Sequence, residues 1–88
     1  MDFRFSRHAE WEMARRGIPL ALVEAVMEHP EQRLVDESGT GRWIHQSRLR
    51  FGDGKMYLLR VVVAEDEQPH VIITAYRTSK IEKYWSAE

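Results

Sequence analysis

Arginine and tyrosine side chains in the second half of the chain are the residues best suited to chemistry. Arg48, Arg50 and Arg60 stand next to apolar residues, and Tyr76 and Arg77 end a stretch rich in β-branched residues. A guanidinium binds phosphate through paired hydrogen bonds, and an aromatic ring stacks on a nucleobase. Gathered on one surface, these side chains would bind a polyanion. The equally good alternative is that the arginines only form the solvated face of a small sheet.

His8 is a separate candidate, for proton transfer. It lies near the expected N-terminus of a helix, with Glu12 one turn later, so the helix dipole and a carboxylate act on its charge in opposite directions. Histidine is the usual general acid or base near neutral pH. A surface or capping role is the more common one for a lone histidine of this kind.

The remaining histidines do not suggest a metal site. His29 stands beside Pro30 and His45 is on an inward row of a strand, so both are weaker candidates than His8. No two of the four histidines have a ligand spacing such as H-x-x-x-H, and the chain has no cysteine. A glycine-rich phosphate loop and a nucleophile elbow are absent as well. We therefore expect neither a metal nor a cofactor.

Four antiparallel strands are expected to position these residues. The first covers Gln32 to Val35, the second Arg42 to Phe51 and the third Lys55 to Ala64. The fourth begins at His70, after the acidic loop Glu65 to Pro69. Polar, glycine-containing turns separate the first three strands, which is typical of a meander.

Alternation along the strands predicts which side chains are exposed. In the second strand one row is apolar at its ends and should point inward; it consists of Trp43, His45, Ser47, Leu49 and Phe51. The open face then presents Gln46, Arg48 and Arg50, together with Arg60 of the third strand. In the last strand the better core row is Val71, Ile73 and Ala75, which would send Thr74 and Tyr76 to the arginine side.

Two helices are expected before the strands. Ser6 is a suitable N-cap for a helix from Arg7 to Arg16, which Gly17 ends. A second helix from Leu20 to Glu28 has a wide apolar arc and should be mostly covered, and Pro30 ends it.

The predicted fold is therefore a two-layer α+β domain over residues 1–88: two N-terminal helices packed on a four-stranded antiparallel sheet, with a short C-terminal helical tail. Phe3 and Phe5, ahead of the first helix, indicate a short edge strand or an extended arm. Tyr84 and Trp85 in the tail would either stack on bases or, the preferred interpretation, close the sheet as a hydrophobic plug.

Composition limits the classes of function. The chain has 88 residues, of which 43% are hydrophobic and 31% charged, as in a single soluble globular domain. The net charge of -1 argues against nucleic-acid binding over the whole surface. Residues 42–64, however, hold five basic residues against Asp53 alone, a local patch that can collect phosphate in a salt-dependent way.

The longest apolar run, Val61 to Ala64, is too short to span a bilayer, and the lack of cysteine fits a reducing compartment. We expect a cytoplasmic protein, or a domain of a larger protein, that does not enter membranes.

Short motifs along the chain resemble a known family. They are Phe5-Ser6-Arg7-His8-Ala9, then Met13, Arg16-Gly17-Ile18, Pro30 and the stretch from Val71 to Arg77. The resemblance is to a bacterial domain-of-unknown-function family marked by an N-terminal His-Ala, an Arg-Gly-Ile helix junction and a closing Thr-x-Tyr strand. That family in turn looks like a remote branch of the RelE/ParE toxin superfamily, whose members have two helices followed by a four-stranded antiparallel sheet. The resemblance covers nearly the whole chain.

The resemblance implies a toxin-like component of a toxin-antitoxin module, with a cognate antitoxin as partner and metal-independent RNA cleavage as the activity. In such cleavage a 2′-hydroxyl attacks the neighbouring phosphate while basic side chains stabilise the developing charge and a general acid protonates the leaving oxygen. Arg48 and Arg60 would hold the phosphate, and Tyr76 or His8 would move protons. The other expected RNA-binding residues are Arg50, Arg77, Lys80 and Lys83.

Two other functions fit the same fold. The chain could be a non-catalytic module that binds a protein partner through its sheet face or its tail. It could also be a gyrase-directed toxin of the ParE kind, which would leave RNA intact.

Overall fold

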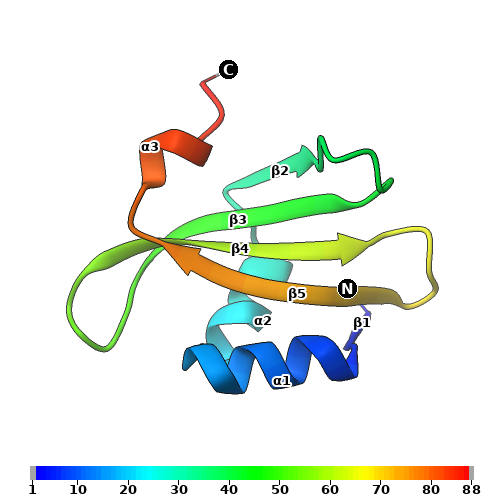
Figure 1. The fold of residues 1–88 in the computed structure, drawn as a ribbon, viewed down its shortest axis with the longest axis horizontal. Coiled ribbons are helices and arrows are strands. Elements are labelled where there is room, and N and C mark those ends of the chain that lie inside the picture. Colours follow the sequence, from blue (N-terminus) through cyan, green and yellow to red (C-terminus); the bar gives the residue numbers. More distant parts are fainter. Residues whose placement is uncertain (1, 88) are drawn as a thin grey trace.

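The computed structural model describes residues 2–87 and shows in them a mixed sheet with three helices (Figure 1). In chain order the elements are β1 (Phe3–Phe5), α1 (Arg7–Arg16), α2 (Leu20–Glu28), β2 (Gln32–Val35), β3 (Trp43–Arg50), β4 (Met56–Ala64), β5 (His70–Thr78) and α3 (Ile81–Tyr84). The predicted α+β class, the bounds of the two N-terminal helices and the short C-terminal helix are confirmed.

The sheet has one strand more than expected. Its order is β1-β5-β4-β3-β2, and β1 runs parallel to β5 whereas the other pairs are antiparallel. The prediction of a four-stranded, wholly antiparallel sheet was therefore wrong. Phe3 and Phe5 supply the missing strand, because their rings pack on the core while their backbone pairs with the first residues of β5. Three residues are too few for a strand pattern to be decisive in the sequence.

A bulge in β5 changes which of its residues face the helices. Val62 pairs with Thr74, but the next residue, Val63, pairs with Ile72, so that Ile73 is an extra residue. The core row is consequently Ile72 and Ala75, and the expected row of Val71, Ile73 and Ala75 was right only for Ala75. The expected placement of Thr74 and Tyr76 on the arginine side is confirmed, since Tyr76 pairs with Arg60 and Thr74 with Val62.

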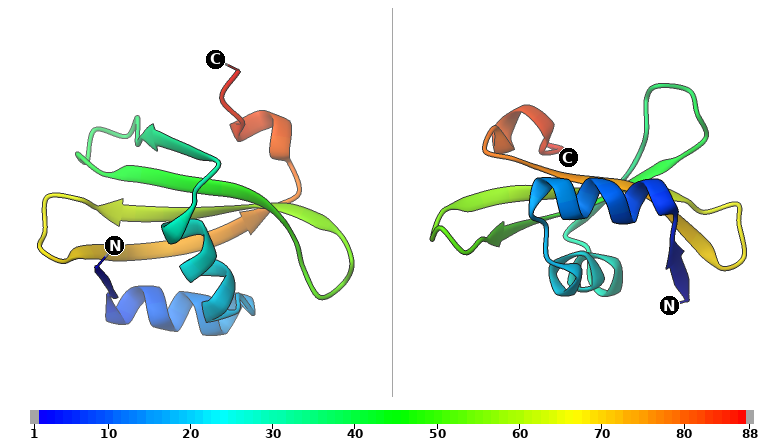
Figure 2. Two further views of the ribbon diagram at one scale, coloured as in Figure 1. Left: turned by 180° about the vertical axis from the view of Figure 1, so that it is seen from behind. Right: turned by 60° about the horizontal axis from the view of Figure 1, so that its bottom comes forward.

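The two N-terminal helices cover different parts of the sheet (Figure 2). We call the side that faces the viewer in Figure 1 the front face, and the side against which α2 packs, across β3 and β4, the back face. α1 instead lies along β5, beyond the residues that β1 covers. It supplies side-chain donors to the strand edge: Ser6 Oγ donates to the carbonyl of Ile73 at 3.2 Å and Arg16 Nη1 to that of Ala75 at 2.8 Å. α1 thus protects an edge that would otherwise be open to pairing.

The core lies between the back face and the helices. Its fully buried members include Val23 and Met27 of α2 and Leu59 and Val61 of β4. Gly17 ends α1 in a left-handed conformation, with φ of 65°, which lets the chain turn into α2. No helix within residues 2–87 combines the length and hydropathy needed to cross a bilayer.

Ser6 joins α1 to β5, and its removal should be measurable. Its Oγ accepts the backbone N–H of Ala9 at 3.0 Å, as an N-cap does, and donates to Ile73. We expect Ser6→Ala to lower the free energy of unfolding by about 1–2 kcal/mol in urea titrations. Ser79→Ala, at an exposed serine just after β5, is the matched control and should cost less than about 0.5 kcal/mol. Equal losses of unfolding free energy in the two variants would contradict the proposal that Ser6 connects α1 to β5.

Candidate functional site

A row of three polar side chains crosses the middle of the front face. Gln46 of β3 pairs with Arg60 of β4, which pairs with Tyr76 of β5, so the three side chains point the same way. Arg60 Nε donates to Gln46 Oε1 at 2.8 Å, and Arg60 Nη1 donates to the Tyr76 hydroxyl at 2.6 Å. The register of three strands therefore holds one guanidinium at the centre of the sheet.

Aromatic rings fix the orientation of that guanidinium. The carbon at its centre lies 4.4 Å from the centroid of the Tyr84 ring and 5.8 Å from that of Tyr76. Within residues 2–87, Arg60 forms no ion pair with a carboxylate. Its Nη2 group is not used in the hydrogen bonds to Gln46 and Tyr76 and can bind an external anion.

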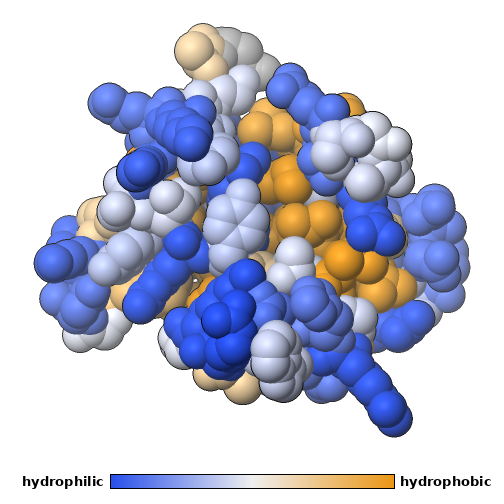
Figure 3. Space-filling view, in the orientation of Figure 1, coloured by the Kyte–Doolittle hydropathy of each residue, from blue (hydrophilic) through white to orange (hydrophobic). Residues whose placement is uncertain are grey.

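A hollow of about 730 Å³ lies beside this row. Its walls are polar and its floor is apolar, as Figure 3 shows for the same face, where orange surface is ringed by blue. Arg60, Lys83 and the two tyrosines line it on one side. The other lining residues are Leu34, Val35, Asp36, Glu37, Ser38, Ile44, Val62 and Ser86.

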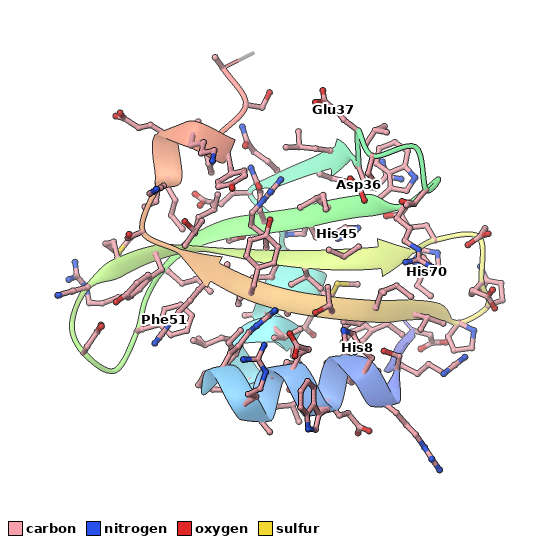
Figure 4. The ribbon with its side chains drawn as sticks, viewed as in Figure 1. His8, Asp36, Glu37, His45, Phe51 and His70 are labelled. Carbon is pink, nitrogen blue, oxygen red and sulfur yellow. The ribbon has the colours of Figure 1, made fainter. Side chains whose placement is uncertain are left out.

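Asp36 and Glu37 bring negative charge to the same hollow, at the turn after β2 (Figure 4). Asp36 Oδ1 accepts the backbone N–H of Ser38 at 3.1 Å, and Oδ2 accepts the Thr40 hydroxyl at 3.2 Å. The Ser38 N–H is the main reason why the pKa of Asp36 lies below its ordinary value, and the charge of Arg60 contributes. The carboxylate is thus held ionised and in one place.

The C-terminal tail closes one side of the hollow. Gln46 Nε2 donates to the carbonyl of Tyr84 at 3.1 Å, and Gln32 Nε2 donates to that of Ser86 at 2.9 Å. The Ser86 N–H returns a bond to Gln32 Oε1 at 3.0 Å. Trp85 lies against Arg48, whose guanidinium carbon is 4.1 Å from the ring centroid. The tail therefore covers part of the front face, and Tyr84 lies beside Arg60.

The four expected catalytic residues do not gather in one place. Arg60 and Tyr76 are in contact. Arg48, on the same face, forms an ion pair with Glu31 at 3.0 Å and does not line the hollow. His8 lies on α1, where its ring is 6.5 Å from that of the exposed Trp11 (Figure 4).

The four expected RNA-binding residues are also spread out. Lys83 lines the hollow, 5.2 Å from the Tyr84 ring. Arg77 faces the other way, 4.6 Å from the Phe51 ring. Arg50 donates to the Gly54 carbonyl in the β3-β4 hairpin at 2.6 Å, and Lys80 immediately precedes α3. Only Lys83 belongs to the same site as Arg60.

Several residues that line the hollow or support it were not recognised from the sequence. Gln46 was placed correctly on the open face but not as a ligand of Arg60. Asp36 and Glu37 were interpreted only as turn residues, and Gln32 only as the start of a strand. A polar residue on a central strand opposite an arginine is a signal that could have identified Gln46. No local pattern indicates that the turn after β2 and the tail line one hollow.

A second polar cluster lies on the back face, away from the hollow. Arg33 binds Glu65 through two hydrogen bonds, one of them from Nε at 2.9 Å, and its guanidinium lies 3.7 Å from the centroid of the Trp43 ring. His45, predicted to point inward, is 1% exposed, and its Nε2 lies 2.6 Å from Glu65 Oε2. Arg33 first, and His45 second, lower the pKa of Glu65 to about 2. Within residues 2–87 no group of histidine and carboxylate side chains is arranged to hold a metal ion.

Comparison with known proteins identifies the family. The sequence pattern of a family described as a domain of unknown function, DUF4258, matches residues 5–77. The chain belongs to this family. No curated protein and no solved structure matches the chain.

Only some of the site residues lie within the part of the chain that matches DUF4258. Gln46, Arg60 and Tyr76 lie within the matched residues 5–77, whereas Lys83 and Tyr84 lie after them. The sheet row is therefore part of the family domain. The tail that completes the hollow lies outside the matched residues.

The bonds from Gln32 to Ser86 should keep the tail on the sheet. We expect Gln32→Ala to raise the rate of tryptic cleavage after Lys80 and Lys83 about 5- to 30-fold. This corresponds to a decrease of about 1–2 kcal/mol in the free energy needed to detach the tail from the sheet. Gln68→Ala, in the exposed β4-β5 loop, is the matched control and should leave the rate unchanged. Mass spectrometry of the first fragments would identify the cleaved bonds; equal rates in the two variants would contradict this function of Gln32.

The Arg33-Glu65 contact predicts a specific acid dependence. Because folding lowers the pKa of Glu65 from 4.5 to about 2, the stability that this group contributes is present above pH 4.5 and is lost as pH falls toward 2. Urea titrations should show wild type more stable than Glu65→Gln at pH 7, by at most about 3 kcal/mol, with the difference shrinking below pH 4.5. Glu67→Gln, at an exposed loop residue, should show no such pH-dependent difference.

Proposed function

We propose that the chain is a toxin-like component of a toxin-antitoxin module that cleaves RNA without a metal, in the front-face hollow. The contact between Arg60 and Tyr76 carries this proposal. The hydroxyl of Tyr76 accepts a hydrogen bond from the guanidinium, so its own proton can point toward a bound group. An anion-binding side chain and a proton donor are thus joined in one unit.

The chemistry follows from that unit. The 2′-oxygen of a bound strand forms a bond to phosphorus and loses its proton to water, while the bond from phosphorus to the 5′-oxygen breaks. Arg60, with Lys83 nearby, stabilises the charge on the non-bridging oxygens. Tyr76 gives its proton to the departing 5′-oxygen and recovers one from solvent. The products are a 2′,3′-cyclic phosphate and a 5′-hydroxyl.

Fold and sequence both support the toxin part of the proposal. Two helices precede the antiparallel strands, which is the order in the RelE/ParE superfamily that the sequence resembles. The sequence analysis named Tyr76 and His8 as alternative residues for proton transfer. In this scheme Tyr76 has that role, and His8, on α1, has none. Arg48 serves the tail rather than the phosphate, since it is engaged by Glu31 and Trp85.

One observation favours a second candidate, a non-catalytic module that binds a protein. The floor of the hollow is apolar, and Val35 in the edge strand β2 is 57% exposed. An antitoxin segment could occupy that floor in either case. The two candidates differ in whether Tyr76 is needed for an activity on RNA.

The test is induced expression in a bacterial host, with growth and total-RNA integrity followed over time, and cleavage by the purified protein. We expect Tyr76→Phe to slow cleavage by about 10²- to 10⁴-fold and Arg60→Ala by about 10²- to 10³-fold, and both to relieve growth arrest. A chelator should not change the wild-type rate.

Matched controls separate chemistry from folding. Tyr57→Phe removes the hydroxyl that binds Asp53 in the β3-β4 hairpin, and Arg7→Ala removes an exposed arginine of α1. Both should cleave RNA like wild type, and thermal melting should show all four variants folded. Unchanged growth and intact RNA with the wild-type protein would refute the ribonuclease and leave the binding module.

A further inference from the structure

The hollow carries opposite charges at its two ends. Register fixes their order along the sheet: Arg60 lies in the row of Gln46, the next row on the front face is that of Ile44 and Val62, and Asp36 follows, its N–H bound to the carbonyl of Arg42 at 2.8 Å. Successive rows on one face are about 7 Å apart. One apolar row therefore separates a cationic end from an acidic end.

A ligand that matches this order has an anion, a flat apolar body and hydrogen-bond donors at its far edge. A nucleotide has these parts in this sequence: phosphate, sugar and base. Its phosphate would meet Arg60 and Lys83, and its base would lie over Ile44 and Val62, beside the ring of Tyr76.

The acidic end selects among the bases. Ionised carboxylates only accept hydrogen bonds, so a base must present N–H groups there. Guanine offers two neighbouring donors on its Watson–Crick edge, N1–H and the N2 amino group, which match the two oxygens of one carboxylate. Uracil offers one N–H between two carbonyl oxygens, and those oxygens would face the carboxylate unfavourably. Single-stranded RNA is read on this edge in general.

Asp36 is the residue best placed to read a base. Its carboxylate is already fixed by the Ser38 N–H and the Thr40 hydroxyl, and each of its oxygens retains a free lone pair. Little entropy is lost when a preorganised acceptor binds. Glu37 lines the hollow next to it and adds a second acceptor.

We propose that the hollow binds a guanine nucleotide, with its phosphate at Arg60 and Lys83 and its base edge at Asp36 and Glu37. This rests on the proposed function, for which it names the base that is read. A free nucleotide and a nucleotide within a strand share this chemistry, and the experiment distinguishes them.

The experiment is equilibrium binding to the purified full chain by titration calorimetry at fixed salt. Guanosine 3′-monophosphate should bind at least about 10-fold more tightly than uridine 3′-monophosphate, and inosine 3′-monophosphate, which lacks the N2 amino group, should fall between them. A pentanucleotide with one guanosine that binds more tightly than the mononucleotide would identify a strand as the ligand; equal affinities would identify the free nucleotide.

Variants locate the two ends. Asp36→Asn should weaken the binding of guanosine 3′-monophosphate about 10-fold without weakening that of uridine 3′-monophosphate, whereas Arg60→Ala should weaken the binding of both equally. Glu37→Gln makes the same test without touching the turn that Asp36 holds together. Asp66→Asn, an exposed aspartate in the β4-β5 loop, is the control and should change neither affinity.

Two results would overturn the proposal: equal binding of the guanosine, inosine and uridine nucleotides, or no nucleotide binding by a protein that cleaves RNA. In either case, RNA cleavage that is lost in the Arg60→Ala and Tyr76→Phe variants would still support the proposed ribonuclease function. Intact RNA together with guanosine-selective binding would refute the ribonuclease and retain the guanine site.

Discussion

The placement of one arginine on a central strand constrains the whole front face. A guanidinium cannot lose protons at any ordinary pH, so the surrounding residues must supply hydrogen-bond acceptors or leave it hydrated. Arg60 is provided with an amide oxygen from β3, a phenol oxygen from β5 and a ring from the tail. None of these partners is a carboxylate, so the positive charge is held in place without being neutralised. A guanidinium held in this way keeps its full charge at the surface of the sheet.

The same face is built from two parts of the chain, only one of which lies within the family match. The family domain supplies the row of Gln46, Arg60 and Tyr76, and the segment after residue 77 supplies the wall that includes Tyr84. The glutamines of β2 and β3 connect the parts, because both donate side-chain amide protons to tail carbonyls. In this chain the shape of the hollow therefore depends on these bonds between the sheet and the tail.

The sequence predicted most of the fold but only the centre of the site. Hydrophobic periodicity, the Ser6 cap and the Gly17 stop were sufficient for both helices, because their signals are local. Strict alternation placed Arg60 and Tyr76 on one face correctly. It could not reveal three other features: Arg77 packs on Phe51, Arg48 is held by Glu31, and Asp36 lies near enough to Arg60 to feel its charge. These features depend on how distant turns and the tail fold over the sheet. For a related reason the sequence left β1 open between a short edge strand and an extended arm: a three-residue strand takes its stability from its partner rather than from its own pattern.

The extra residue in β5 puts the two halves of that strand out of phase. Before Ile73 the even-numbered Ile72 faces the helices, and after it the odd-numbered Ala75 does. A single strand thus satisfies the core at one end and presents Tyr76 to the opposite side at the other. Without Ile73 the pairs Val63–Ile72 and Val62–Thr74 would follow each other directly, and Tyr76 would still lie opposite Arg60 on the front face. The front-face pair therefore depends on the register between β4 and β5, and the bulge adds one residue and a local bend to β5 without changing that register.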